Sequence, residues 1–338
     1  MNDQADTLRR MMQERLSARE PDRATRPTGT ETRGGQGPVV ITAACGKGGV
    51  GKSCLVANVG TALARAGVRT LLVDGDFGLA NLDILLGLSP GAPAGQWVAT
   101  MEDIVDGRAR ISEAVMGVEP NLWIVPAASG VMDVRFAGTQ LRERAISIFE
   151  SCPWEMDAVL VDVGAGIHSR VLSLHSPAFR SVIVVTPEPT SITDAYGLIK
   201  LLRRQRLVTR PQVIVNQVTD EAEAEQVFGR LDEVAQRYIE GVELEYLGFV
   251  PHDEKISRSV RQRKILLDLD LESPAAASFE RLARRLRPQA RGVTGVHMNV
   301  DRCPGDEPGL SRFTEEPARV APGNSARFWR TLLGEVRA

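Results

Sequence analysis

The stretch PVVITAACGKGGVGKSCLVA, residues 38–57, decides the fold of this chain. It joins a short apolar run, VVITAA at 39–44, to a glycine-rich loop, GKGGVGKS at 46–53, and the loop opens a helical pattern. The loop matches the phosphate-binding sequence G-x-x-x-x-G-K-[ST] in full. A buried strand that leads through such a loop into a helix is the local structure that cradles nucleoside phosphates.

The individual residues of this loop predict a site for a magnesium–triphosphate complex. Glycines let backbone N–H groups turn toward phosphate oxygens, and the helix N-terminus adds the positive end of its dipole. Lys52 is expected to reach the β- and γ-phosphates, and Ser53 to ligate Mg²⁺. The alternative is a glycine-rich turn with a surface lysine. The predicted nucleotide-binding residues here are Gly46, Lys47, Gly48, Gly49, Val50, Gly51, Lys52, Ser53 and Cys54.

Short apolar runs alternate with helical patterns over most of the remaining chain. Continuous Val, Ile and Leu runs favour parallel strands that are buried on both faces. The alternation predicts a doubly wound, mostly parallel α/β sheet of about seven or eight strands, a P-loop NTPase architecture with its chemistry at the carboxyl ends of the strands. The predicted strands are 39–44, 70–74, 121–125, 158–162, 181–186, 212–216 and 245–250, with helices at 53–66 and 191–205 among those between them.

The composition changes four times along the chain and predicts five segments. Residues 1–17 have the spacing of a short amphipathic helix. Residues 18–37 and 288–324 are rich in Pro, Gly and charged residues without a period, which is typical of linkers. Residues 38–287 form the α/β domain, and residues 325–338 have the pattern of a second amphipathic helix.

Charge and cysteine content exclude several classes of protein. The net charge is -2 and the pI is near 6.2, so no direct nucleic-acid partner is expected. No apolar run approaches the roughly 18 residues of a membrane span, and the N-terminus has no apolar signal region. The four cysteines, without a C-x-x-C pair, argue against a disulfide framework or an ordinary zinc site. The chain is expected in a reducing cytoplasm.

Three aspartates end predicted strands near the loop. Asp74 and Asp76 lie in LLVDGDFGLANLDILLG, residues 71–87, and Asp162 lies in AVLVDVGAG, residues 158–166. Carboxylates beside a triphosphate repel it unless Mg²⁺ or water lies between them. Asp162 is therefore expected to hold Mg²⁺ through water, and Asp74 to be an outer magnesium ligand or a structural residue. Polar strand ends without a role are the alternative for Asp74 and Asp76.

Lys47, a second lysine beside the first glycine of the loop, resembles the deviant Walker A motif of the MinD/ParA ATPases. The resemblance implies an ATPase that dimerises with ATP, in which Lys47 reaches the partner's phosphates and acts with Lys52. It also implies that Asp76 orients the attacking water. Asn216 and Pro251 stand at positions where this family holds adenine, although Asn216 could instead cap a turn.

Further stretches resemble the flagellar regulators FlhG, FleN and YlxH within that family. They are the D-x-G-A-G form around Asp162, EPTSITDAYGLIK at 188–200 and PHDEKISRSVRQRK at 251–264. The resemblance implies control of flagellar number and placement. The implied partners are basal-body C-ring proteins and, in some relatives, an enhancer-binding transcriptional activator. The terminal D-Q-A-x-x-L-R element, implied to stimulate the signal-recognition-type GTPase FlhF, consists of Asp3, Gln4, Ala5, Leu8 and Arg9.

The second amphipathic helix resembles the membrane-targeting segment of MinD, which implies reversible binding to the inner face of the cytoplasmic membrane. Apolar side chains could enter the lipid interface while arginines meet anionic headgroups. Packing of this helix on its own domain is the alternative. The predicted membrane residues are Phe328, Trp329, Leu332, Leu333 and Val336.

Two other functions remain open at this stage. One is a cell-division or DNA-partition ATPase on the same fold, for which the terminal D-Q-A-x-x-L-R element is the discriminating feature. The other is an iron–sulfur reductase or cluster scaffold, which needs paired cysteines across a dimer axis. Cys152 alone, just before the strand at 158–162, does not suggest such a cluster.

Overall fold

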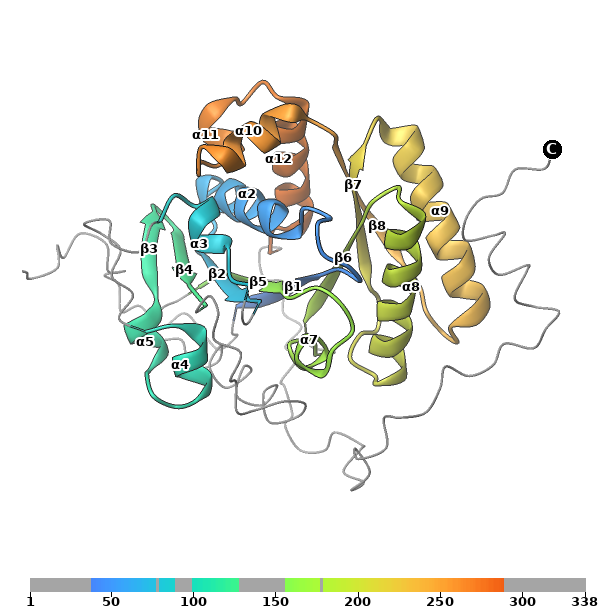
Figure 1. The fold of residues 1–338 in the computed structure, drawn as a ribbon, viewed down its shortest axis with the longest axis horizontal. Helices are drawn as coiled ribbons and strands as arrows, with labels where there is room; N and C mark the ends of the chain where they lie inside the picture. Colours follow the sequence, from blue (N-terminus) through green and yellow to red (C-terminus); the bar gives the residue numbers. More distant parts are fainter. Residues whose placement is uncertain (1–37, 77–78, 89–98, 128–155, 177–178, 289–338) are drawn as a thin grey trace, which may run out of the picture. The chain divides into compact units, whose positions relative to one another are not determined.

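Figure 1 shows the fold of the chain in the computed structural model. The chain divides into two units, Met1–Gly35 and Gln36–Ala338, and every residue described below belongs to the second. The structure describes residues 38–76, 79–88, 99–127, 156–176 and 179–288. The predicted segments 1–17, 18–37 and 325–338 lie outside these residues, as does 288–324 after its first residue.

One eight-stranded sheet organises the described residues, with the strand order β3-β4-β2-β5-β1-β6-β7-β8. All neighbouring strands pair in parallel except β3 and β4, which are antiparallel. This confirms the predicted doubly wound, mostly parallel sheet. The strands are β1 (Val39–Ala44), β2 (Thr70–Gly75), β3 (Met116–Glu119), β4 (Leu122–Val125), β5 (Ala158–Val163), β6 (Arg180–Val185), β7 (Gln212–Val218) and β8 (Glu245–Pro251).

Helices cover both faces of this sheet (Figure 1). Helices α2, α3, α11 and α12 contribute to the hydrophobic cluster on one face, and α4, α5, α7, α8 and α9 to the cluster on the other. Helix α10 packs beside α11. The helices are α2 (Lys52–Arg65), α3 (Leu82–Leu85), α4 (Met101–Val105), α5 (Ile111–Ala114), α7 (Ser169–Ser173), α8 (Pro189–Arg204), α9 (Glu221–Tyr238), α10 (Glu254–Arg261), α11 (Leu266–Leu269) and α12 (Pro274–Leu286).

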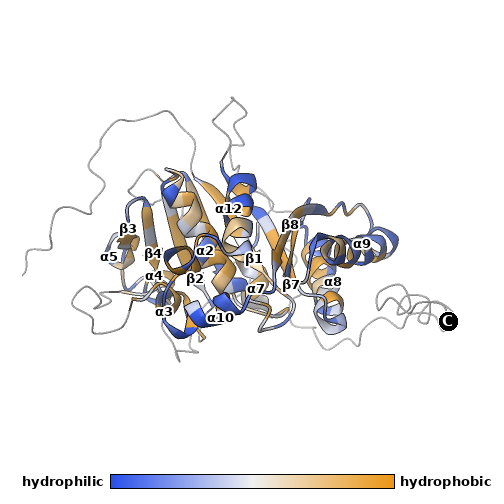
Figure 2. Cartoon of the chain, turned by 90° about the horizontal axis from the view of Figure 1, so that it is seen from above, coloured by the Kyte–Doolittle hydropathy of each residue, from blue (hydrophilic) through white to orange (hydrophobic). Residues whose placement is uncertain are grey.

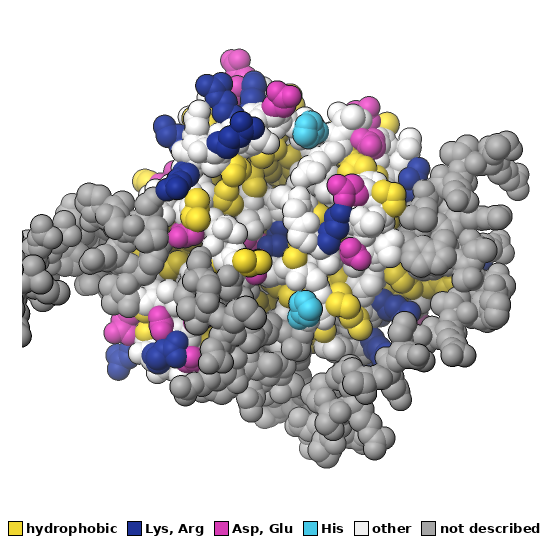
Figure 3. Space-filling view, viewed as in Figure 1, with side chains coloured by type: hydrophobic (Ala, Val, Ile, Leu, Met, Phe, Trp, Pro, Cys, Tyr) yellow, Lys and Arg dark blue, Asp and Glu magenta, His cyan; other side chains and the backbone are white. Residues whose placement is uncertain are grey.

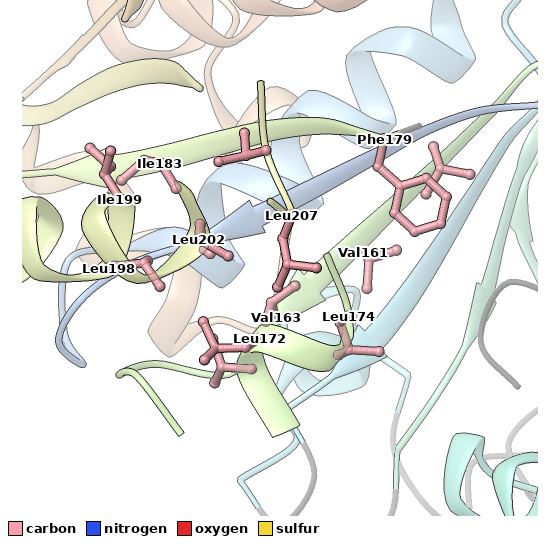
Figure 4. Packing of buried hydrophobic residues seen from close by; sticks show 14 of the residues in the cluster. Val161, Val163, Leu172, Leu174, Phe179, Ile183, Leu198, Ile199, Leu202 and Leu207 are labelled. Carbon is pink, nitrogen blue, oxygen red and sulfur yellow. The ribbon is translucent and has the colours of Figure 1, made fainter. Parts of the chain in front are cut away.

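The central strands are buried because they carry apolar side chains on both faces. Every residue of β2 and β5 is buried, and Figure 2 shows hydrophobic strands between helices whose outer sides are hydrophilic. Figure 4 shows one of the two clusters, in which Ile183 of β6 lies near Ile199 and Leu202 of α8. Burial on both faces explains why these strands read as continuous apolar runs.

The topology places the phosphate loop at the carboxyl edge of the sheet. Strand β1 lies between β5 and β6, and the chain leaves it through the loop that opens α2. Parallel strands end at one common edge, so the residues after β1, β2 and β5 meet there. In the register of β2 and β5, Asp74 is the partner of Asp162. The sheet therefore brings together two carboxylates that are far apart in the sequence.

All seven predicted strands are present, and β3 is the strand that the sequence did not predict. Strand β3 is only four residues long and none of its residues is buried. A short, exposed edge strand lacks the apolar run that marks the central strands. The predicted helices 53–66 and 191–205 correspond to α2 and α8. Among the described residues, no helix is long and apolar enough to cross a membrane.

Phe279 of α12 is one of the largest fully buried side chains, at 1% exposed. We expect Phe279→Ala to lower the free energy of unfolding by about 3–5 kcal/mol, because it removes buried area and leaves a cavity. Leu271, which is 64% exposed, supplies the control: Leu271→Ala should change stability by about 0.5 kcal/mol or less. Urea denaturation of both variants measures the two values. Equal losses would show that the packing of α12 on the sheet is wrong.

Candidate nucleotide-phosphate site

The loop between β1 and α2 has the backbone geometry of an anion-binding loop. Gly49 and Gly51 have φ angles of +83° and +80°, in the left-handed region that favours glycine. At Gly46, a Cβ atom would lie 2.3 Å from the backbone carbon of Asp194 in α8. These three positions therefore need glycine, and the loop turns into the N-terminus of α2, where backbone N–H groups face an anion favourably.

Lys52 lies at the base of this loop and pairs with Asp162. Both side chains are almost fully buried, with 5% and 2% of their surface exposed. Burial by itself disfavours the charged amine, but the charge of the Asp162 carboxylate and the hydrogen bond to it outweigh burial, so the pKa of Lys52 is raised. The ammonium group is therefore held charged in a site that excludes most water.

Asp74 is buried and serves the local backbone. One carboxylate oxygen accepts a hydrogen bond from the N–H of Asp76 at 3.0 Å, and the other accepts from the N–H groups of Asn81 and Leu82 at 3.2 and 3.1 Å. Burial, and then the charge of Asp162, raises the pKa of Asp74 to about 7. These contacts fit the structural alternative predicted for Asp74, because they fix the start of α3 at the end of β2.

Asp76 lies between the ends of β2 and β5. A Cβ atom at Gly164 would lie 3.0 Å from a carboxylate oxygen of Asp76, so the loop after β5 closes on this side chain. Burial raises the pKa of Asp76, and the charge of Lys52 opposes that rise. The same loop is tied to the phosphate loop, since the N–H of Gly166 donates to the carbonyl of Cys45 at 3.0 Å. This hydrogen bond connects the two loops directly.

Lys47 lies at the outer side of the loop, where its side chain is 29% exposed. Its ammonium group pairs with Glu188 and donates to the hydroxyl of Thr190 at 2.9 Å. Both partners belong to the start of α8. The sequence pattern did not single out Glu188 or Thr190 individually, because contact with Lys47 depends on β6 lying next to β1.

Asn216, predicted to contact adenine, contacts the phosphate loop. Its amide N–H donates to the carbonyl of Val50 at 2.7 Å. Pro251 ends β8, which pairs with β7, and the following N–H of His252 donates to the carbonyl of Val218 at 2.7 Å. The structure thus brings the two predicted adenine residues to neighbouring strand ends beside the loop. Their contact with adenine stays a prediction.

Two cysteines flank the loop, and the nucleotide contact predicted for Cys54 stays a prediction. Cys45 is 1% exposed, and burial raises the pKa of its thiol to about 11. Burial also raises the pKa of Cys54 to about 11, although Asn58 donates to its sulfur at 3.4 Å. Thiols that stay protonated at neutral pH are poor nucleophiles. Cys152 lies outside the described residues.

The residues at this edge fit a nucleotide phosphate with Mg²⁺. The predicted metal residues, Asp74, Asp162 and the hydroxyl of Ser53, are oxygen donors, which Mg²⁺ prefers, and it usually keeps several waters. The buried Lys52 and the loop N–H groups complement anionic phosphate oxygens. Figure 3 shows this face of the molecule, with basic and acidic side chains side by side near its centre. The roles assigned to Ser53, Asp76 and Asp162 from the sequence stay predictions.

Comparison with known proteins agrees with this site. The family description "CobQ/CobB/MinD/ParA nucleotide binding domain" matches residues 41–267. The antiactivator FleN of Pseudomonas aeruginosa is 36% identical over 73% of this chain and 85% of FleN. The flagellum site-determining protein YlxH of Helicobacter pylori is 32% identical over 72% of this chain and 80% of YlxH. The MinC:MinD cell division complex of Aquifex aeolicus contains a chain with 32% identity and a TM-score of 0.58, covering 76% of this chain and 98% of that one.

The loop, its buried lysine and the strand-end carboxylates define a nucleotide-binding ATPase domain of the phosphate-loop class. This chain belongs to the CobQ/CobB/MinD/ParA nucleotide-binding family. Its similarity to FleN and YlxH confirms the predicted resemblance to the FlhG group.

The raised pKa of Asp74 predicts a pH dependence of stability without nucleotide. The unfolded carboxyl titrates near 3.8 and the folded one at about 7, so between these values the unfolded state binds fewer protons. The contribution of Asp74 to the free energy of unfolding should therefore be largest below pH 4 and fall as the pH rises to 7.

Urea denaturation at pH 5, 6, 7 and 8 checks this dependence. Asp74→Asn should be less stable at every pH, because one of the two acceptor oxygens becomes an NH₂ donor that faces a backbone N–H, and its pH slope between 5 and 7 should be flatter than that of the wild type. Identical slopes in the two proteins would contradict the assignment to Asp74.

Proposed function

We propose that this chain is an ATP-dependent switch that dimerises with ATP and is reset by slow hydrolysis. The observation that carries this proposal is the second lysine, Lys47, placed at the exposed side of a complete phosphate loop. A cation at the mouth of the loop can reach a phosphate held by a second copy, and a cation supplied in trans couples hydrolysis to association. Membership of the MinD/ParA family supports this reading.

Each residue of the site has a defined task in this scheme. Lys52 leaves Asp162 and binds the β- and γ-phosphates. Asp162, through water, and the hydroxyl of Ser53 would hold Mg²⁺, which would neutralise phosphate charge when it is bound. Asp76 holds the attacking water in line with the γ-phosphate.

Lys47 is restrained within its own chain, which sets a threshold for association. Its pairing with Glu188 and its hydrogen bond to Thr190 must break before the ammonium group can reach across to a second copy. The side chain of Glu188 is 61% exposed. Exposed ion pairs contribute little stability, so the negatively charged phosphates of a second copy can replace Glu188.

We infer that the switch controls flagellar number and placement. The similarity to the antiactivator FleN and to the flagellum site-determining protein YlxH supports this role. In this scheme residues 1–17, through Asp3 to Arg9, stimulate an FlhF-type GTPase, and C-ring proteins or an enhancer-binding activator are further partners. Residues 325–338 attach the dimer reversibly to the inner face of the membrane, because two weak helices bind together more tightly than one.

Replacement of Asp76 tests the hydrolysis step. Asp76→Ala should lower ATP turnover by about 100-fold or more, because it removes the group that positions water, while ATP binding persists. The ATP-bound variant should accumulate as a dimer, which light scattering coupled to size exclusion detects. Glu272→Ala, at an exposed carboxylate outside the site, is the matched control and should turn over normally. Unchanged turnover in Asp76→Ala would remove Asp76 from the mechanism.

The N-terminal segment provides a separate test of the flagellar role. A peptide of residues 1–17 should raise the GTP hydrolysis rate of the FlhF protein from the same organism. A peptide with Asp3→Ala, Gln4→Ala and Arg9→Ala should not. Stimulation by the full chain that survives deletion of residues 1–17 would reject this segment as the activator. A septum-site role, as in the Bacillus subtilis MinD relative at 30% identity, would instead leave FlhF unaffected.

A further inference from the structure

Two residues at the end of β7, Asn216 and Gln217, contact the carbonyl groups of the phosphate loop. The side chain of Asn216 is buried, at 6% exposed, and its amide N–H donates to the carbonyl of Val50 at 2.7 Å. The amide nitrogen of Gln217 lies 3.5 Å from the carbonyl of Gly49, at the outer limit of a hydrogen bond. The carbonyl of Gly49 therefore faces Gln217, and the next carbonyl, of Val50, faces Asn216. The hydrogen bond from Asn216 is the shorter and stronger of the two.

Gln217 has an unusual backbone that fixes Asn216 in place. Its φ angle is +61°, in the left-handed backbone region that residues other than glycine, asparagine and aspartate rarely adopt. The pairing of β7 with β8 shifts register between Asn216 and Val218, which leaves Gln217 exposed at the shift. In this conformation the N–H of Gln217 donates to the side-chain oxygen of Asn216 at 3.0 Å. The strained residue thus locks the rotamer of its neighbour.

The bond to Val50 determines where the loop N–H groups point. A peptide unit is planar and trans, so its C=O and the following N–H point in opposite directions. Because the carbonyl of Val50 faces Asn216, the N–H of Gly51 must face the other way, toward the inside of the loop. A Cβ atom at Gly51 would lie 2.5 Å from the Asn216 amide nitrogen, so only glycine permits this approach.

We propose that Asn216 and Gln217 are positioning residues for the phosphates, acting through the loop and not only on the base. Asn216 orients the Val50–Gly51 peptide, and the left-handed backbone of Gln217 holds Asn216 in the required rotamer. The proposal rests on the nucleotide site, which family membership establishes, and is independent of dimerisation and of the flagellar role. It makes the base-side end of β7 part of the anion site.

A phosphate ligand without a base separates this role from adenine contact. The probe is inorganic tripolyphosphate with Mg²⁺, measured with the full chain by displacement of a fluorescent ATP analogue, beside Mg-ATP itself. We expect Asn216→Ala to weaken tripolyphosphate and ATP by similar factors, about 10-fold or more, because both need the oriented loop. Unchanged tripolyphosphate affinity with weakened ATP binding would overturn the proposal and leave Asn216 as a base contact only.

Two variants of Gln217 test the backbone part and guard against simple unfolding of Asn216→Ala. Asparagine tolerates the left-handed region, whereas valine, which is β-branched, does not. Gln217→Asn should keep tripolyphosphate affinity within about 2-fold, and Gln217→Val should lose about 10-fold. Thermal unfolding without ligand shows whether each variant is folded. Equal affinities for tripolyphosphate in folded Gln217→Asn and Gln217→Val would overturn the role of the backbone.

The readout also separates this proposal from the proposed switch. Tripolyphosphate binding needs neither hydrolysis nor a second copy. The proposal for Asn216 can therefore be wrong, with unchanged tripolyphosphate affinity in Asn216→Ala, while Asp76→Ala still loses turnover as the switch mechanism predicts. In the reverse result, Asn216→Ala loses tripolyphosphate affinity as expected but Asp76→Ala turns over ATP at the wild-type rate. That result would reject the switch mechanism and keep the role of Asn216.

Discussion

The buried ion pair between Lys52 and Asp162 is the interaction on which the site depends. Removing one partner of such a pair leaves an uncompensated charge in a dry environment, which strongly destabilises a fold. The pair joins the first turn of α2 to the end of β5, so it fixes the phosphate loop against the centre of the sheet. Lys52 and Asp162 are also the residues predicted to bind the phosphates and to hold Mg²⁺, so this ion pair is formed by predicted ligand-binding groups.

Two further carboxylates, Asp74 and Asp76, lie at the carboxyl edge of the sheet near this ion pair. Asp74 stands beside Asp162 in the register of β2 and β5, and three backbone N–H groups donate to its carboxylate, which opposes the effect of burial on its pKa without cancelling it. Asp76, two residues later, is only half-buried and keeps access to the loop after β5. Asp74 therefore shapes the start of α3, whereas the chemical role of Asp76 stays a prediction, although both belong to the same short motif.

Several elements that are distant in the sequence contact the phosphate loop. The start of α8 contacts it through Glu188, Thr190 and Asp194, and the end of β7 contacts it through Asn216. Because β6 and β7 lie in order beside β1, these contacts follow from the sheet topology. Each contact therefore holds the loop against an element that is distant from it in the sequence.

The sequence by itself determined the fold class, the loop with Lys52 and the seven strands with continuous apolar runs, because these are local patterns of residue type and spacing. It did not predict β3, which is short and exposed. It also did not indicate that Asn216 donates to Val50, that Glu188 pairs with Lys47, or that Gln217 adopts a left-handed backbone. Tertiary structure alone decided these features, because contacts between distant segments depend on strand order and register, which no short stretch of sequence encodes.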